Sequence, residues 1–370
     1  MDVSEAAGPF ELFEGHEQVV FGADERSGLR CIIAVHSTAL GASLGGTRFY
    51  PYDTEREALV DVLRLSRAMT YKAACAGLDQ GGGKAVIIGD PESDKSEALL
   101  RAYARVIDSL GGRYITACDV GTYPPDMTVI QRETRWVTGM DAEHGGSGDS
   151  GITTAHGVHV ALRAVAEHLW GDPDLRGRHV AVQGLGKVGR RLVSHLAEDG
   201  AKLTVADIDE DVVAEVVDHH PLEVVDPDAI YDVDADILSP NALGAVLTEE
   251  TISRLRVAAV CGGANNQLGA VEDAARLADA DVLYAPDYVV NAGGLIQVTD
   301  ELEPGGFSRE RTLRKAEGIG HTLREIFSLA TTEGLTTEIA AERVADRRIA
   351  EVGRLRRFHL PDGESRVRGR

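Results

Sequence analysis

The 370-residue chain has only four cysteines, and they lie far apart at Cys31, Cys75, Cys118 and Cys261. No CxxC pair or other metal-ligand spacing occurs, so we expect neither disulfides nor a metal site. Aromatic residues make up 5% of the chain, too few to suggest stacking on nucleic-acid bases. No apolar run approaches the ~20 residues of a membrane-spanning helix, and the first residues lack the pattern of a secretory signal. A cytoplasmic protein without a membrane partner is therefore expected.

Basic residues are scarce relative to acidic ones, with 38 Lys and Arg against 60 Asp and Glu and a formal net charge of −22. Such a chain repels the phosphates of nucleic acids and of acidic membrane surfaces, so nucleic acid is not an expected partner either. The chain is too long for one ordinary hydrophobic core, and no internal repeat divides it. Two globular domains are therefore expected.

The region up to about residue 148 mixes patterns typical of strands and of helices. β-branched residues at 30–37 predict a strand. Thr54 and the glutamate three residues later have the spacing of a capping box, and apolar residues then recur at helical spacing until Gly77. Residues 84–89 predict a short buried strand, and 96–110 predict a second helix. The N-terminal domain is therefore expected to be α/β.

A cluster of small and polar residues at 143–151, EHGGSGDSG, predicts a hinge between two domains. After it, five strand-like segments alternate with helix-like segments. This alternation is typical of a parallel sheet covered by helices on both faces. The basic segment 353–370 contains proline and glycine and is expected to be a disordered tail.

A glycine-rich motif follows the first strand-like segment of the second domain. Gly184, Gly186 and Gly189 have GxGxxG spacing, and Asp207 ends the next strand-like segment. In a Rossmann domain these glycines permit a tight turn, the approach of a pyrophosphate and close helix packing, while the acid binds a ribose diol. The motif therefore predicts a dinucleotide site, with Lys187 and Val188 in the same loop.

A glycine turn in an unrelated α/β domain is the alternative interpretation of the glycine triple taken alone. Arg190 and Arg191 in the next helix, and Lys202 before Asp207, are basic groups that count slightly against NAD. The Asp207 carboxylate repels a 2′-phosphate, however, so NAD is preferred to NADP.

Two lysines and an aspartate each lie beside a glycine-rich segment that we interpret as a bend. Lys84 follows three glycines, Lys72 lies at the end of the Thr54 helix, and Asp119 follows a strand-like segment. A desolvated lysine near another cation has a lowered pKa and can act as a base. Taken singly, each lysine is more often a solvated surface residue. The three side chains are a candidate catalytic group if the fold brings them together.

Five motifs in one order make the sequence resemble a known enzyme family. They are HSTALGASLGGTRFYPY, MTYKAACAGLDQGGGKAVIIGDP, GGRYITACDVGT, VCGGANNQL and YAPDYVVNAGGLIQV, within roughly residues 30–300. Together they resemble the glutamate, leucine, phenylalanine and valine dehydrogenases, and the branched-chain enzymes most closely. The resemblance implies a homo-oligomer that converts an L-amino acid, NAD⁺ and water to a 2-oxo acid, ammonia and NADH, and also catalyses the reverse amination.

The resemblance also implies which domain binds the substrate and which binds NAD. Residues 1–148, with a returning C-terminal helix near 325–350, form an α/β substrate domain. Residues 149–320 form a Rossmann-type NAD-binding domain, and an active-site cleft lies between the two.

The resemblance implies roles for individual residues. Lys84 is the general base that activates water, and Asp119 handles protons at the amino group and steadies Lys84. Lys72 binds the substrate carboxylate, which the backbone at Gly45 and Gly46 approaches. Further polar contacts to substrate or cofactor are implied for Asn265, Asn266, Asn291, Asn241, Thr154 and Ser150.

Substrate preference is expected to depend on a small apolar pocket whose implied walls are Leu44, Ala117, Leu295 and Val298. Leu295 stands where leucine dehydrogenases have valine, so the pocket is smaller and valine is the favoured substrate, with leucine and isoleucine overlapping. Two alternatives stay open. One is an aromatic amino-acid dehydrogenase on the same scaffold, and the other is a non-catalytic NAD- or amino-acid-binding sensor.

Four positions depart from the family pattern. Cys118 replaces a glutamate of the leucine enzymes, although valine enzymes also carry cysteine there. Asn241 replaces the usual cysteine, Gly263 the commoner alanine, and His156 an aromatic or apolar residue.

Overall fold

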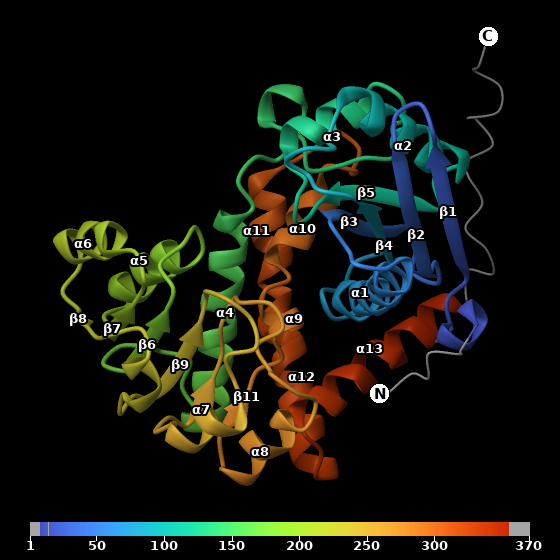
Figure 1. Ribbon diagram of the computed structural model, residues 1–370. Helices are drawn as coiled ribbons and strands as arrows, with labels where there is room; N and C mark the ends of the chain where they lie inside the picture. Colours follow the sequence, from blue (N-terminus) through green and yellow to red (C-terminus); the bar gives the residue numbers. More distant parts are fainter. Residues whose placement is uncertain (1–7, 14, 355–370) are drawn as a thin grey trace. The chain divides into compact units, whose positions relative to one another are not determined.

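The computed structural model describes residues 8–13 and 15–354. The chain divides into two compact units (Figure 1). Unit 1 comprises Met1–Gly148, Val298–Phe307 and the chain from Ala345, and unit 2 comprises Asp149–Gln297 and Ser308–Val344. Among the described residues, no helix has both the length and the apolar character needed to cross a membrane.

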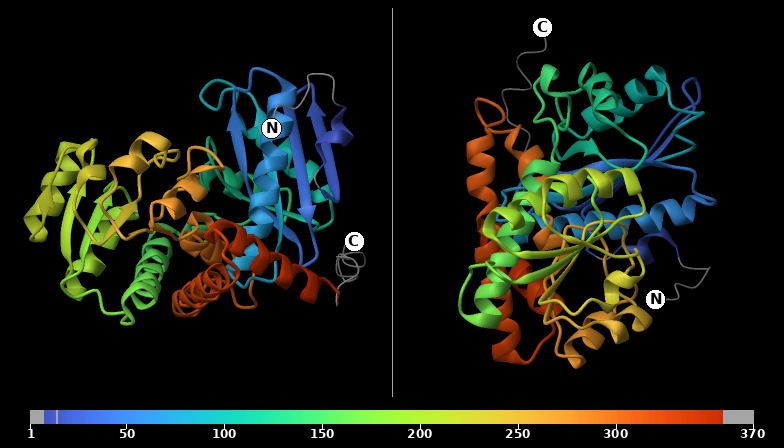
Figure 2. Two further views of the ribbon diagram at one scale, coloured as in Figure 1. Left: turned by 90° about the horizontal axis from the view of Figure 1, so that it is seen from below. Right: turned by 90° about the vertical axis from the view of Figure 1, so that its left-hand side faces the viewer.

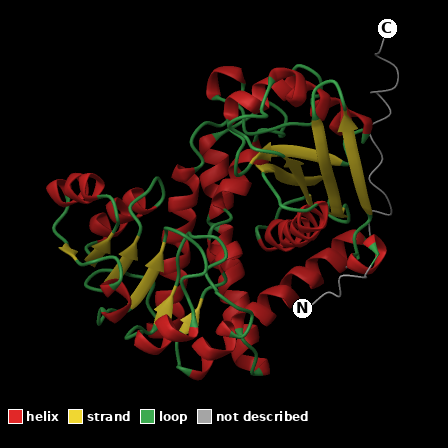
Figure 3. Cartoon of the chain, viewed as in Figure 1, coloured by secondary structure: helices red, strands yellow, loops and turns green. Residues whose placement is uncertain are grey.

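Unit 1 is built on a five-stranded mixed sheet in the order β1-β2-β4-β3-β5 (Figure 3). Its strands are β1 (Gln18–Asp24), β2 (Leu29–Ser37), β3 (Ser43–Tyr50), β4 (Gly81–Ile88) and β5 (Tyr114–Cys118). The pairs β1–β2 and β2–β4 are antiparallel, whereas β3 pairs in parallel with both β4 and β5. Strand β4 therefore lies at the centre of the sheet.

Helices cover both faces of this sheet (Figure 1). They are α1 (Glu55–Cys75), α2 (Glu97–Ser109) and α3 (Pro124–Gln131). Ile32 and Val86 pack in one apolar cluster with residues of α1, while Ile33 and Ala85 pack in another with residues of α2 and α3. Alternate residues of each strand thus face opposite layers, as the period of two in a strand requires.

Local signals fixed the ends of α1. Thr54 accepts a hydrogen bond from the Glu57 amide, and Glu57 accepts one in return, so the capping box is confirmed. The helix ends at Cys75, and Gly77 has the left-handed φ of +68° that favours glycine after a helix.

The interpretation of Gly81–Gly83 as part of a bend was wrong. All three glycines belong to β4, which begins earlier than the expected 84–89. A Cβ added to Gly82 lies 2.1 Å from the Thr70 backbone nitrogen on α1, and one added to Gly81 lies 1.9 Å from the Ser37 oxygen. The glycines permit close approach of the helix and the neighbouring chain to the central strand.

Unit 2 has the all-parallel sheet that the alternating pattern predicts, in the order β11-β10-β9-β6-β7-β8. Its strands are β6 (His179–Gln183), β7 (Lys202–Ala206), β8 (Glu223–Val224), β9 (Ile237–Pro240), β10 (Ala259–Val260) and β11 (Leu283–Tyr284). Strand β8 was not expected from the sequence, because it has only two residues and both are exposed.

Helices flank the parallel strands of unit 2 (Figure 2). They are α4 (Gly151–Trp170), α5 (Gly189–Asp199), α6 (Glu210–His219), α7 (Glu249–Arg254), α8 (Asp273–Asp279), α9 (Asp287–Val290), α11 (Arg309–Ala316) and α12 (Gly318–Glu333). Helix α5 packs on β6 and β7, and α4 packs on both α5 and α12. On another side, Ile252 of α7 and Leu277 of α8 share an apolar cluster with Leu238 and Val260 of the sheet.

The returning segments differ from the expected helix at 325–350. Residues 325–344 stay in unit 2, because α12 packs along α4. Unit 1 instead receives Val298–Phe307, which includes the end of α10 (Gly293–Asp300), and the last part of α13 (Thr337–Gly353). Gly353, which we expected in a disordered tail, belongs to α13, and residues 355–370 of that segment lie outside the described residues.

One carboxylate ties the returning segment 298–307 to the rest of unit 1. Glu301 accepts hydrogen bonds from the Thr138 hydroxyl at 2.5 Å and the Gly139 amide at 2.8 Å. Its other oxygen accepts from the Ser147 amide at 2.8 Å and the Ser147 hydroxyl at 2.5 Å. Four donors converge on one ionised group, so its hydrogen bonds are charge-assisted.

Replacing Glu301 with glutamine should destabilise unit 1, because an amide nitrogen cannot accept from the two donors that it then faces. We expect a loss of about 1–3 kcal/mol in the free energy of unfolding and faster amide hydrogen exchange at Gly139 and Ser147. Urea denaturation and exchange mass spectrometry measure both effects. Glu143→Gln, in an exposed position of the same unit, is the control. Equal stability of the two variants would show that the four hydrogen bonds contribute little.

Candidate functional site

Lys84 lies on the central strand of unit 1 with its side chain almost completely buried. The residue is 6% exposed, and its Nζ lies 3.0 Å from Oδ2 of Asp119, which follows β5. Burial lowers the pKa of Lys84 below its ordinary value, while the Asp119 carboxylate opposes this shift without reversing it. The fold therefore brings together the expected base and its expected partner.

Strand register explains why these residues share one face of the sheet. Leu44 and Arg48 of β3 lie beside Gly82 and Val86 of β4, and Gly46 lies beside Ala117 of β5. Residues two apart on a strand share a face, and neighbours on paired strands do so too. Because Val86 packs against α1, Lys84 and Asp119 belong to the α1 side as well.

Gly45 and Gly46 lie where any side chain would collide with the strands on either side. A Cβ on Gly45 would lie 1.7 Å from the Gly83 oxygen, and one on Gly46 would lie 2.8 Å from the Asp119 Cβ. Glycine at position 46 therefore leaves room for the Asp119 side chain. The structure thus gives both glycines a packing reason, in addition to the implied approach of a carboxylate.

Lys72 lies in the last turn of α1 and is half-buried. Two residues before it, the Thr70 backbone contacts Gly82, which is itself two residues before Lys84. Helix and strand therefore converge where each carries a lysine. Lys72 and Lys84 both belong to unit 1, and each follows this contact by two residues.

Arg48 is a member of this group that the sequence analysis missed. Its Nε donates to Oδ2 of Asp119 at 3.1 Å, and its Nη1 donates to Oδ2 of Asp61 on α1 at 2.8 Å. The Tyr52 hydroxyl also donates to Asp61, at 2.6 Å. The sequence contained one indication of this: Gly46 and Arg48 are two residues apart on β3, so both positions face the same side of the sheet.

The glycine motif of unit 2 forms the turn between β6 and α5. Gly184 has a left-handed φ of +89°, and a Cβ on Gly189 would lie 1.9 Å from the Gly184 oxygen. Gly186 is exposed, with nothing within 4 Å of an added Cβ. Lys187 is exposed and Val188 half-buried beside it. The loop thus offers an open backbone in front of a helix, which fits a pyrophosphate.

Asp207 follows β7, next to the glycine turn. Its Oδ2 accepts from the Leu185 amide at 2.5 Å, and its Oδ1 accepts from the Asp209 amide at 2.9 Å. The carboxylate therefore helps to fix the turn and is half-buried at the carboxyl edge of the sheet. It is in the position that a ribose-binding acid occupies in a Rossmann domain.

Asn241, at the end of β9, uses its side chain within the protein. It donates to the Ser239 oxygen at 2.9 Å and accepts from the Gly263 amide at 3.0 Å. A Cβ on Gly263 would lie 2.9 Å from the Asn241 Oδ1. The two departures from the family pattern therefore touch each other, because the larger side chain at 241 occupies the space that an alanine at 263 requires.

The other asparagines lie around the loop after β10. Asn265 and Asn266 are exposed, and Asn266 has a left-handed φ of +51°. The Nδ2 of the buried Asn291 donates to Oδ1 of Asn265 at 2.9 Å. Asn291 therefore orients Asn265, and the two belong to one hydrogen-bonded group.

Thr154 and Ser150 lie together at the start of α4. The Thr154 hydroxyl donates to the Ser150 backbone oxygen at 3.0 Å. A Cβ on Gly294 would contact the Thr154 hydroxyl at 3.3 Å and the Ser150 side chain at 3.8 Å. Both hydroxyl side chains therefore adjoin the NAGG segment within unit 2.

The four expected pocket walls are divided between the units. Leu44, Ala117 and Val298 belong to unit 1, and Leu295 belongs to unit 2. Leu44 and Ala117 lie on the α1 side of the sheet with Lys84, and both are buried. The Val298 oxygen accepts from the Thr138 hydroxyl at 2.7 Å.

Cys118 and His156 have ordinary structural surroundings. The Cys118 Sγ lies 3.5 Å from the Gly139 oxygen, and burial raises the pKa of this thiol to about 12. It is therefore a neutral thiol near neutral pH. His156 is half-buried on α4, with Nε2 2.8 Å from a carboxylate oxygen of Glu317.

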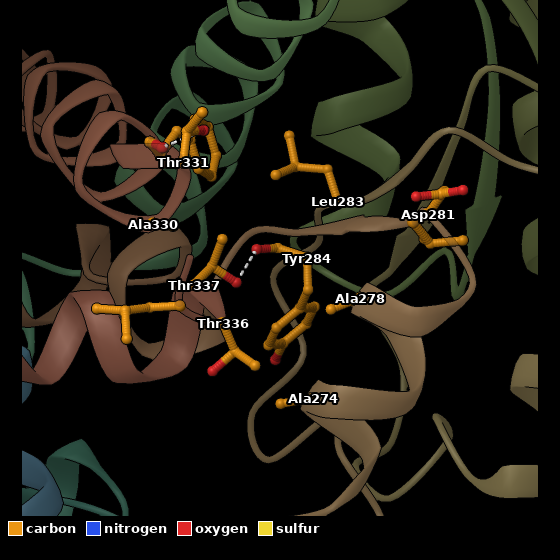
Figure 4. Close-up of a pocket in the computed structure, with 12 residues that line it drawn as sticks. Ala274, Ala278, Asp281, Leu283, Tyr284, Ala330, Thr331, Thr336 and Thr337 are labelled. Carbon is orange, nitrogen blue, oxygen red and sulfur yellow. Dashed lines mark hydrogen bonds between the residues drawn. The ribbon is translucent and has the colours of Figure 1, made fainter. Parts of the chain in front are cut away.

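A cavity of about 430 Å³ in unit 2 lies away from all the predicted site residues (Figure 4). Alanines of α8, Tyr284 and threonines before and within α13 line it. The Thr337 hydroxyl donates to the Tyr284 backbone oxygen at 2.6 Å across its wall. It contributes no residue to the catalytic group or to the dinucleotide loop.

Comparison with known proteins agrees with this geometry. The family model described as the dimerisation domain of the Glu/Leu/Phe/Val dehydrogenases matches residues 16–136. The model described as Glutamate/Leucine/Phenylalanine/Valine dehydrogenase matches residues 145–216 and 207–357. Enzymes of this family depend on a nicotinamide dinucleotide.

Individual relatives match over almost the whole chain. The valine dehydrogenase of Streptomyces coelicolor is 55% identical over 340 residues, which cover 91% of this chain and 93% of the relative. The leucine dehydrogenase of Geobacillus stearothermophilus is 47% identical, with 94% of each chain covered. The crystal structure of L-tryptophan dehydrogenase from Nostoc punctiforme superposes with a TM-score of 0.84 at 44% identity, covering 93% of this chain and 98% of that one. The chain is a member of the Glu/Leu/Phe/Val dehydrogenase family, and it is an amino-acid dehydrogenase.

Proposed function

We propose that the protein catalyses the NAD-dependent oxidative deamination of a branched-chain L-amino acid, with valine preferred, and the reverse reductive amination. The observation that carries the proposal is the buried ion pair of Lys84 and Asp119, 3.0 Å apart on the α1 side of the unit 1 sheet. Burying a lysine costs desolvation free energy, and an apolar residue would fill the same space without that cost. A protein that only bound an amino acid would have no use for a buried base at this position.

Lys72 and Lys84 take different parts in the proposed reaction. Lys72 binds the substrate carboxylate, which can come close to the backbone because Gly45 and Gly46 carry no side chains. Lys84, with its lowered pKa, accepts a proton from water, which then attacks the imine carbon of the substrate. The products are the 2-oxo acid and ammonia.

Asp119 handles the protons on the substrate nitrogen. Its Oδ2 is engaged by Lys84 and Arg48, and we assign Oδ1 to the substrate nitrogen. At the end of the cycle, the proton that Lys84 took from water passes through Asp119 to the solvent, which restores the neutral base. Apolar neighbours such as Leu44 and Ala117 reduce the access of bulk water, which strengthens these charge interactions.

NAD, when bound, would supply the oxidant for the hydride of the substrate Cα. Its pyrophosphate is assigned to the loop Gly184–Gly189, where Gly186 leaves the backbone open. Its ribose is assigned to Asp207, and Thr154, Ser150 and the Asn265–Asn291 pair are proposed to orient its other polar groups or those of the substrate. Asn241 contributes by fixing the loop at Gly263.

We propose a homo-oligomer, supported by the description of the family model over residues 16–136 as a dimerisation domain. We also propose a reducing cytoplasm as its location, which is compatible with four free cysteines.

Lys84→Ala should bind NAD normally and lose turnover by roughly 10²–10⁴-fold, because it lacks the base. In the wild type, kcat/KM for valine should rise with pH as Lys84 loses its proton, and this rise should occur below the ordinary pKa of lysine because burial lowers it. The alanine variant should lack that rise. Lys202→Ala, at an exposed position of β7, is the control. A Lys84→Ala variant with near-normal kcat would contradict the assignment of the base.

Asp207→Asn should weaken NAD binding by about tenfold or more, since a charge-assisted hydrogen bond to the ribose is lost. It should also narrow the preference for NAD over NADP, because the 2′-phosphate is no longer repelled. Fluorescence titration of both dinucleotides measures this, with the exposed Asp211→Asn as the control. An unchanged ratio of the two affinities would count against Asp207 as the discriminating group.

Valine should exceed phenylalanine in kcat/KM by roughly 10–200-fold, because Leu295 reduces the space available for the substrate side chain. Leucine and isoleucine should lie between them. The appearance of reduced nicotinamide absorbance with each amino acid provides the measurement. Phenylalanine as the best substrate would favour the aromatic alternative, and no turnover with any amino acid would favour the sensor.

A further inference from the structure

Two cations share a single oxygen of the Asp119 carboxylate. Lys84 Nζ lies 3.0 Å from Oδ2, and Arg48 Nε donates to the same atom at 3.1 Å. Two donors on one oxygen define the rotation of the carboxylate more strictly than one donor can.

Arg48 is itself held by a second carboxylate, that of Asp61. Its Nη1 donates to Asp61 Oδ2 at 2.8 Å, and Asp61 also accepts from the Tyr52 hydroxyl at 2.6 Å and from Arg64 at 3.0 Å. Arg48 and Asp61 are both mostly buried, with side chains 23% and 16% exposed. The planar guanidinium thus spans two carboxylates, which a lysine at this position could not reproduce.

We infer that Arg48 is a positioning residue of the active site, which fixes the Asp119 carboxylate so that Oδ1 is available to the substrate nitrogen. The inference rests on the proposed function. It adds that Arg48 of β3 fixes the orientation of Asp119 beside Lys84, and that Asp61 of α1 in turn orients Arg48.

The charges around Lys84 predict the direction in which its pKa moves when one of them is removed. After burial, Asp119 raises the pKa of Lys84, Arg48 lowers it and Asp61 raises it. Lys72, in the last turn of α1, is unchanged in every variant considered. Loss of Arg48 should therefore move the Lys84 titration to higher pH, whereas loss of the Asp61 charge should move it to lower pH.

If Arg48 had a purely structural role, the variants would differ from the wild type in another way. Arg48 joins β3 to α1 through Asp61, so Arg48→Gln and Asp61→Asn would then both loosen the same contact. Both variants would lower stability, and neither would shift the pH profile in a direction that depends on the charge removed. Opposite shifts in the two variants are therefore specific to the proposed role.

The experiment compares the variants Arg48→Gln, Arg48→Lys and Asp61→Asn with the wild type, all as full-length protein. We expect Arg48→Gln to lower kcat for valine by roughly 10–100-fold through misplacement of Asp119, with KM for NAD unchanged because unit 2 is untouched. Its kcat/KM profile should shift to higher pH. Arg48→Lys should keep the wild-type position of the profile and recover part of kcat, and Asp61→Asn should shift the profile to lower pH. Arg105→Gln, a surface arginine of α2, is the control.

A second readout does not depend on turnover. The rate at which an amine-specific acylating reagent modifies Lys84, followed across pH by peptide mass spectrometry, reports the titration of Lys84 directly. The midpoint should move up in Arg48→Gln and down in Asp61→Asn. If Arg48→Gln does not fold, the other two variants still test the inference.

Equal profiles in all variants, or shifts in one direction only, would overturn the role of Arg48. Failure of the proposed function gives a different result, in which the wild type oxidises no amino acid while the labelling midpoints still shift in opposite directions. The two failures are therefore distinguishable.

Discussion

Lys84 keeps an ammonium group almost out of reach of water, and the Asp119 carboxylate 3.0 Å away is what makes this position tolerable. An isolated buried charge would cost several kcal/mol or lose its proton. Because β3 lies between β4 and β5, the ion pair requires a residue of β3 without a side chain at that point. Gly46 meets that requirement, since any side chain there would collide with Asp119.

The ion pair is one half of a balanced group of four charges. Lys84 and Arg48 supply two positive charges, and Asp119 and Asp61 supply two negative ones, from β4, β3, the end of β5 and α1. Lys84 and Arg48 would repel each other, but both contact the carboxylate of Asp119. Burial keeps the pKa of Lys84 low, and the two carboxylates prevent an uncompensated charge, which suits a general base.

Unit 2 shows how one side chain can serve both packing and binding. The Asp207 carboxylate accepts two backbone amides of the loops beside it, so it helps to form the turn in which a dinucleotide is proposed to bind. Asn241 and Gly263 form a comparable pair, because the amide side chain and the missing methyl group fit each other. Changes at such positions are coupled, and a substitution at one is best interpreted together with its partner.

Local patterns in the sequence determined the features that depend on residues close together in the chain. These are the Thr54 capping box, the glycine turn at Gly184, the parallel sheet of unit 2 and the change of domain near residue 148. Only the tertiary structure decided that Gly81–Gly83 form the central strand, that Arg48 meets Asp119, and that segment 298–307 returns to unit 1. The physical reason is that strand register and helix packing join residues tens to hundreds of positions apart. No local spacing encodes which of these distant partners will meet.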